Sequence, residues 1–129
     1  MHYYLCAMAK TVVIGASPNP SRYSYRATMQ LAGFGEEVFP IGIRAGQIGP
    51  HEIITDKPAI ADVETVTLYV GPQNQSSWVD YILALRPKRV IFNPGTENPT
   101  FEAVLRKEGI LFESACTLVM LATGTYATL

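Results

Sequence analysis

The sequence predicts an α/β fold in which helices cover both faces of a mainly parallel sheet of five or six strands. Apolar, β-branched runs alternate along the chain with segments whose apolar residues recur at helical spacing. Most of these runs lead into a loop that contains glycine or proline. The chain has 129 residues, 48% of them hydrophobic and 16% charged, which suits one domain with one core.

The first strand and the first helix have clear signals. Residues 11–14 form a β-branched run, TVVI, which ends at a glycine- and proline-containing loop. From Ser24, a candidate N-cap, the apolar spacing is helical up to about Ala32. Gly33 or Gly35 is expected to end this helix.

The middle of the chain contains two more predicted strands and a helix. Residues 38–41, VFPI, are the second apolar run. The segment 42–58, with three glycines and two prolines, reads as a loop that holds a short extra strand at 51–54. Residues 65–70 are a strand by composition, and apolar residues at helical spacing predict a helix over 78–85.

The last part of the chain predicts two strands and two helices. Residues 89–92 are a strand. Asn98 as N-cap and Gly109 beyond the last turn frame the best-marked helix. Residues 110–113 are expected to be the last strand, and 115–122 a last short helix.

Strands joined by helical segments predict a parallel sheet, because parallel neighbours require crossover connections. We therefore expect a doubly wound, Rossmann-like fold. Ligands of such folds bind outside the carboxyl ends of the strands. The loops after Ile14, Ile41, Val70 and Phe92 are where a site is expected.

Charge and hydropathy exclude several kinds of partner. Ten Lys and Arg against eleven Asp and Glu leave a net charge of −1, which argues against a nucleic-acid partner. The apolar stretch at the N-terminus is too short for a membrane span. We expect a cytoplasmic protein with no membrane partner. We expect residues 1–9 to be an N-terminal extension and 10–129 to be a single domain.

The cysteine pattern predicts neither a metal site nor disulfides. Cys6 and Cys116 make no CxxC spacing, and His2 and His51 lie far apart in sequence. Reduced thiols fit a cytoplasmic protein. Cys116, near the start of the last helix, is the one candidate nucleophile, and a core position beside its apolar neighbours is the favoured interpretation.

The loop after the first strand is a candidate phosphate site. Gly15 and Ser17 lie between a strand and a helix, where the helix N-terminus offers amide donors to an anion. The alternative is a plain strand-to-helix turn. Arg22 at the end of the loop is a candidate phosphate ligand. An NAD site requires an acid at the carboxyl end of the second strand, whereas Glu36 and Glu37 precede that strand, so NAD is disfavoured.

Three segments resemble one known family. They are VIGASPNPSRYSYR at 13–26, VFPI at 38–41 and NPG at 93–95. Together they resemble the small single-domain CoA-binding proteins, whose fold is similar to the nucleotide-binding domain of the succinyl-CoA synthetase α-subunit. The resemblance runs from Lys10 to about Tyr126.

The resemblance implies a coenzyme A (CoA) site at the carboxyl edge of the sheet. The implied residues are Gly15, Ala16, Ser17 and Arg22 at the phosphates, Ser24 and Tyr25 at the helix N-terminus, Pro40 and Ile41 at the adenine or ribose, and Val70, Gly71 and Gly95 in the rest of the crevice. After the second strand this sequence has Gly42-Ile43-Arg44 in place of the short polar turn common in the family. Arg44 is either a ligand of the CoA 3′-phosphate or a solvated surface charge.

The leading functional hypothesis is a protein that binds CoA or an acyl-CoA without catalysing a reaction, as a sensor or carrier with an unidentified protein partner. The synthetase relatives use a phosphorylated histidine in a second domain, and we expect that activity to be absent. One alternative is a small acyl- or thiol-exchange enzyme that acts on CoA through Cys116. Another is a module for NAD or a different adenine nucleotide.

Overall fold

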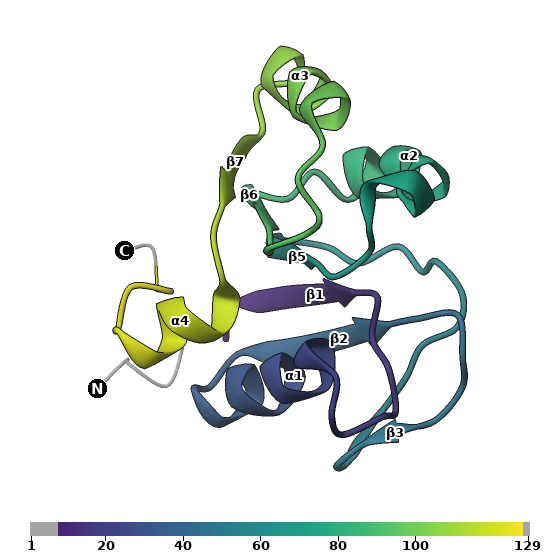
Figure 1. The fold of residues 1–129 in the computed structure, drawn as a ribbon, viewed down its shortest axis with the longest axis vertical. Helices are drawn as coiled ribbons and strands as arrows, with labels where there is room; N and C mark the ends of the chain where they lie inside the picture. Colours follow the sequence, from purple (N-terminus) through teal and green to yellow (C-terminus); the bar gives the residue numbers. More distant parts are fainter. Residues whose placement is uncertain (1–7, 128–129) are drawn as a thin grey trace.

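The computed structural model describes residues 8–127, so most of the predicted extension at 1–9 lies outside the described residues. A sheet of five parallel strands, in the order β2-β1-β5-β6-β7, forms the centre (Figure 1). The strands are β1 (Lys10–Ile14), β2 (Glu37–Ile41), β5 (Val63–Leu68), β6 (Arg89–Phe92) and β7 (Leu111–Ser114). The structure confirms the predicted α/β, doubly wound architecture.

The chain builds the sheet in two directions from β1. It first places β2 on one side of β1, then returns to place β5 on the other side, followed by β6 and β7. The strand order therefore reverses at β1. In doubly wound sheets the ligand crevice opens at this reversal, outside the carboxyl ends of the strands. Here those ends are Ile14 and Leu68, which are register partners.

Helices cover both faces of the sheet, as predicted (Figure 1). The helices are α1 (Tyr23–Gly33), α2 (Ser76–Leu85), α3 (Pro99–Lys107) and α4 (Thr117–Ala122). Val13 packs with Leu31 of α1 and Met120 of α4. Its neighbour Val12 packs with Ile82 of α2, because successive side chains of a strand point to opposite faces. Burial of each such side chain stabilises the fold by about 1.5–3 kcal/mol.

The predicted N-cap of α3 and the predicted glycine after α1 are confirmed, but the predicted start of α1 is not. Asn98 accepts a hydrogen bond from the Phe101 amide at 3.2 Å and caps α3. Gly35 follows α1 with a φ of 91°. Ser24, predicted as N-cap, is instead buried in the first turn of α1, whose N-cap is Arg22. Within the preceding loop the Arg22 amide donates to the carbonyl oxygen of Asn19, and the helix begins earlier than the sequence predicts.

Two other predicted elements differ in extent. β5 ends at Leu68 rather than residue 70, because the chain turns away into the 3-10 helix η2 (Pro72–Asn74). The short strand expected at 51–54 is β4 (His51–Glu52), which forms an antiparallel hairpin with β3 (Gln47–Ile48) apart from the main sheet. Boundaries elsewhere shift by one or two residues.

Candidate functional site

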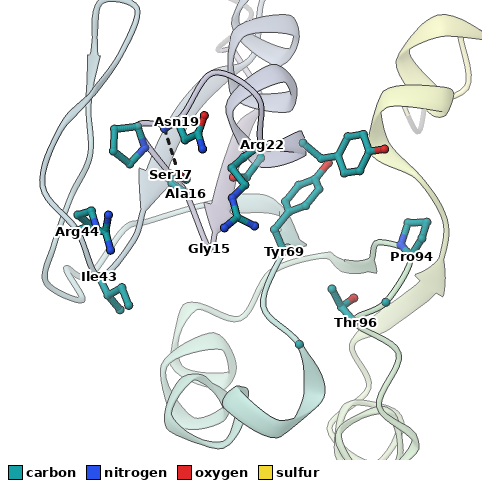
Figure 2. A pocket seen from close by; sticks show the side chains of 15 residues that line it. Gly15, Ala16, Ser17, Asn19, Arg22, Ile43, Arg44, Tyr69, Pro94 and Thr96 are labelled. Carbon is teal, nitrogen blue, oxygen red and sulfur yellow. Dashed lines mark hydrogen bonds between the residues drawn. The ribbon is translucent and has the colours of Figure 1, made fainter.

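Two adjoining cavities open at the carboxyl ends of β1 and β5, where the strand order reverses. Their volumes are about 430 and about 700 Å³. The smaller one, the Pro94 lobe, extends to Pro94 and Thr96 (Figure 2), and the larger one, the Trp78 lobe, extends to Trp78. The lobes share Gly15, Ala16, Arg22, Ile43, Tyr69 and Gly71. We refer to the two lobes together as the carboxyl-edge cleft.

Gly15 and Ala16 form the floor of the cleft. Both of their amides donate to the carbonyl oxygen of Ile41, at 3.0 Å each. Gly15 has a φ of 98°, and a Cβ atom there would lie 2.8 Å from the carbonyl oxygen of Tyr69. The fold itself therefore requires glycine at this position. The two amides are engaged within the protein and are not free donors for an anion.

The loop that joins β1 to α1 is held by its own side chains. Ser17 Oγ accepts from the Asn19 amide at 3.1 Å, and Asn19 Oδ1 accepts from the Ser21 amide at 3.0 Å. Such local bonds are typical of turns and help to order the loop. Because Ser17 uses its oxygen as an acceptor here, its hydroxyl hydrogen is available to a ligand in the Pro94 lobe.

Arg22 and Arg44 place two guanidinium groups on the Pro94 lobe. Both residues are exposed, and neither guanidinium group forms an ion pair or hydrogen bond with another described residue. Arg22 points between Gly15 and Tyr69 (Figure 2). No Asp or Glu side chain lines either lobe in the part of the chain that the structure describes. The cleft therefore carries a local positive charge within a protein of net charge −1.

Tyr69 forms the wall that the two lobes share. Its hydroxyl oxygen is buried and has no hydrogen-bond partner among the described residues. The nearby hydroxyls of Thr67 and Thr117 bond to each other at 2.8 Å. Burial is the main cause that raises the pKa of Tyr69 above its usual range, so the phenol is neutral.

The turn after β6 closes the far side of the Pro94 lobe. The Thr96 amide and hydroxyl both donate to the carbonyl oxygen of Asn93, at 2.9 and 2.8 Å. The Gly95 amide donates to Glu97 Oε1 at 2.9 Å. Glu97 therefore holds this turn in shape next to the cleft, a role that the sequence did not predict.

The Trp78 lobe has a different chemistry from the Pro94 lobe. Apart from Arg22, its polar lining side chains are the neutral groups of Gln73, Asn74, Ser76 and Ser77. Trp78 lies at its end, and the Lys57 ammonium stacks over the indole at 4.6 Å from the ring centroid. The cleft thus joins a lobe lined by two guanidinium groups to a lobe in which Arg22 is the only charged lining side chain among the described residues.

Most of the residues implied by the sequence lie in the cleft. Those that line it are Gly15, Ala16, Ser17, Arg22, Ser24, Val70, Gly71 and Gly95. Tyr25, Pro40 and Ile41 line neither lobe. Pro40 and Ile41 are buried in β2, and Tyr25 packs against the small cluster of Ala16, Ile48 and Ile53. These three support the loops of the cleft from behind.

The sequence did not identify several lining residues. They include Asn19, Tyr69, Pro94, Thr96 and Trp78. Tyr69 falls within the strand predicted over 65–70, and Trp78 is the first residue of the helix predicted over 78–85. Both lie at the carboxyl edge because β5 ends earlier, and α2 begins earlier, than predicted. Pro94 and Thr96 lie in a loop that the topology had already marked as functional.

Cys116 lines neither lobe. It is half-buried as the N-cap residue of α4, and its thiol is free. No group of three or more His, Cys, Asp or Glu side chains within residues 8–127 is placed to hold a metal ion. None of the helices in the same range is long and apolar enough to cross a membrane.

The fold and the cleft define a doubly wound α/β domain with a cleft at the carboxyl edge of its parallel sheet. Residues 9–122 match the model of the CoA binding domain family, so the chain belongs to that family. This confirms the resemblance found in the sequence. A comparison with curated proteins gives no match.

Several solved structures have the same fold. One, a crystal structure of an uncharacterized protein, is 50% identical, with a TM-score of 0.90, and covers 94% of this chain and 100% of its own. A protein from Thermus thermophilus is 23% identical, with a TM-score of 0.77, and covers 92% and 91%. A conserved hypothetical protein from Pyrococcus furiosus is 24% identical, with a TM-score of 0.75, and covers 87% and 98%. The last two support the fold alone.

Proposed function

We propose that the protein binds CoA or an acyl-CoA in the carboxyl-edge cleft without catalysing a reaction on it. The observation that carries the proposal is the pair of unpaired guanidiniums, Arg22 and Arg44, on the cleft of a CoA-binding-domain fold. CoA bears a diphosphate and a 3′-phosphate, and guanidinium groups bind phosphate oxygens through charge-assisted hydrogen bonds.

Within this proposal the two arginines bind different phosphates. Arg22 is the N-cap residue of α1, an 11-residue helix whose first amides have no intrahelical acceptors. A diphosphate between Arg22 and the Ser17 hydroxyl gains both the side-chain donors and the positive end of the helix dipole. Arg44 follows β2, across the lobe from Arg22 (Figure 2), and is assigned to the 3′-phosphate.

The surroundings of β2 favour CoA over NAD. NAD sites place an acid at the carboxyl end of the second strand to hold the ribose hydroxyls. Here that end continues into Gly42, Ile43 and Arg44, and the cation there suits a phosphorylated ribose. Glu37 begins β2, and Glu36 bonds to Thr11 at 2.8 Å, so both acids lie at the opposite edge of the sheet.

The experiment that tests the proposal compares ligands on the free protein. Thermal unfolding is followed with CoA, acetyl-CoA, dephospho-CoA and NAD at equal concentrations, and the small molecules that copurify are identified by mass spectrometry. A ligand at about 100 times its Kd stabilises by roughly 2.7 kcal/mol, a shift of several degrees in Tm for a domain of this size. CoA should raise Tm by more than NAD does. An equal or larger shift with NAD would refute the proposal.

Binding without catalysis has its own test at Cys116. If CoA only binds, incubation with acetyl-CoA or CoA disulfide leaves the mass of the protein unchanged, and Cys116→Ser keeps the affinity for CoA. A stoichiometric adduct that disappears in Cys116→Ser would instead favour an enzyme that exchanges acyl or thiol groups.

A further inference from the structure

We propose that Gln75 is a positioning residue for the CoA site, although it lines neither lobe. Its side chain joins the loop after β5 to the loop after β6, and these two loops form one side of the cleft. The inference rests on the proposed function, because it concerns how the same cleft is kept ready for its ligand.

The contacts of Gln75 connect two separate loops. Its Nε2 donates to the carbonyl oxygen of Val70 at 2.8 Å and to that of Thr96 at 2.7 Å. Its Oε1 accepts from Asn98 Nδ2 at 2.9 Å. Val70 lines the Trp78 lobe, and Thr96 lines the Pro94 lobe. One amide therefore bridges the walls of the two lobes.

The burial of Gln75 shows that these bonds are not incidental. The residue is 0% exposed, and both hydrogens of its amide have acceptors. It is the N-cap residue of α2, yet its side chain makes no capping bond to that helix. A buried amide with satisfied hydrogen bonds specifies one arrangement of its partners, whereas an apolar side chain of similar size would fill the same space without doing so.

Asn98 completes this network on the other side. Its Oδ1 accepts from the Phe101 amide and caps α3, while its Nδ2 is the donor to Gln75. Gln75 is thereby held by the start of α3 and in turn holds both loops. We infer that these loops form a preorganised wall, against which the ligand is bound by the more cationic loops after β1 and β2.

The primary test is the kinetics of CoA binding by Gln75→Leu. If the bridge keeps the wall in its binding-competent form, its loss lowers the competent fraction, and a fall of that fraction to a tenth raises Kd about tenfold. Stopped-flow binding should show the loss mainly as slower association. A core variant with a matched loss of Tm, such as Leu105→Val, is the control and should keep the association rate.

A second variant keeps the test decisive if Gln75→Leu does not fold. Asn98→Asp retains the oxygen that caps α3 but replaces the donor to Gln75 with a second acceptor oxygen. It should weaken CoA binding several-fold. Thr100→Asp adds the same charge at an exposed position of the first turn of α3, two residues from the half-buried Asn98, without touching Gln75, and should have little effect. Affinities of all folded bridge variants within twofold of wild type would overturn the proposal.

Hydrogen exchange separates this inference from the proposed function. If the wild-type protein does not bind CoA, the proposed function fails, but the bridge is still measurable in the free protein. The amides of the loops at 69–71 and 95–97 should then exchange faster in Gln75→Leu than in Leu105→Val. Equal exchange in the two variants would overturn the positioning role.

Discussion

Arg44→Ala should weaken the binding of CoA but not of dephospho-CoA, whereas Arg22→Ala should weaken the binding of both. The prediction follows from assigning the 3′-phosphate to Arg44 and the diphosphate to Arg22. Dephospho-CoA lacks only the 3′-phosphate, so it removes the partner of one arginine and leaves the partner of the other. Neither guanidinium has another partner among the described residues, so neither substitution breaks an internal hydrogen bond or ion pair.

The size of the effect follows from the kind of bond. A hydrogen bond to a charged group contributes about 1.5–3 kcal/mol, and about 1.4 kcal/mol corresponds to a factor of ten in Kd. Each arginine should therefore be worth roughly 10- to 100-fold in affinity for the ligand that carries its phosphate. The free protein should keep its Tm, because substitutions at such exposed positions change stability by no more than about 0.5 kcal/mol.

The assay is isothermal titration of the wild type, Arg22→Ala and Arg44→Ala with CoA and with dephospho-CoA. Arg26→Ala is the matched control. Arg26 lies one turn along α1 and lines neither lobe, although it stacks at 5.2 Å over the ring of Tyr23, which lines the Pro94 lobe. Its loss should change affinity only slightly, through long-range electrostatics that salt screens. The assignment of Arg44 is refuted if Arg44→Ala weakens dephospho-CoA as much as CoA. Unchanged CoA affinity in Arg22→Ala removes Arg22 from the site.

Three further predictions concern the stability of the cleft and of the opposite edge. Gly15→Val should lower Tm by several degrees and abolish CoA binding, because the side chain would strain the backbone and collide with Tyr69; a normal Tm by calorimetry would contradict this. Tyr69→Phe removes an unpaired buried hydroxyl and should leave the free energy of unfolding unchanged or higher, and a loss above about 1 kcal/mol in urea unfolding would show a hidden partner. Glu36→Gln should raise Tm at neutral pH and not in acid. Burial raises the pKa of Glu36, so the folded state loses stability as the pH rises through that pKa, and glutamine removes this loss. A stabilisation by Glu36→Gln that persists in acid would argue against a titration effect.

The sequence predicted the fold well because the signals for this fold are local. Each β-branched run and each helical repeat is visible within about ten residues, and the handedness of crossover connections restricts how they assemble. Asn98 was identified as a cap because capping involves residues three apart in sequence. Ser24 was misassigned because the bonds that start α1 earlier belong to the preceding loop, where Asn19 accepts from the Arg22 amide.

Apart from the family resemblance, which also implied the cleft residues Val70, Gly71 and Gly95, only one loop of the sequence carries a signal for the candidate site. Gly15, Ser17 and Arg22 lie in one short segment and were identified together. Tyr69 and Gln75 take their roles from loops that meet only in the folded chain. Gln75 lies 21 residues from Thr96 in sequence, and no local pattern relates them. A polar residue before an amphipathic helix suggests a cap, and only the tertiary structure shows that its side chain crosses to other loops.

Gly15 shows that a residue can match a binding motif because the fold requires it, without itself binding the ligand. A glycine after the first strand is read as space for a phosphate, yet its positive φ and its contact with the Tyr69 carbonyl require glycine with no ligand present. Its amide and that of Ala16 bond to Ile41. The evidence for an anion therefore lies in side chains that the fold does not need: Arg22 and Arg44 are exposed and unpaired, and a polyanion is the ligand that would make use of both.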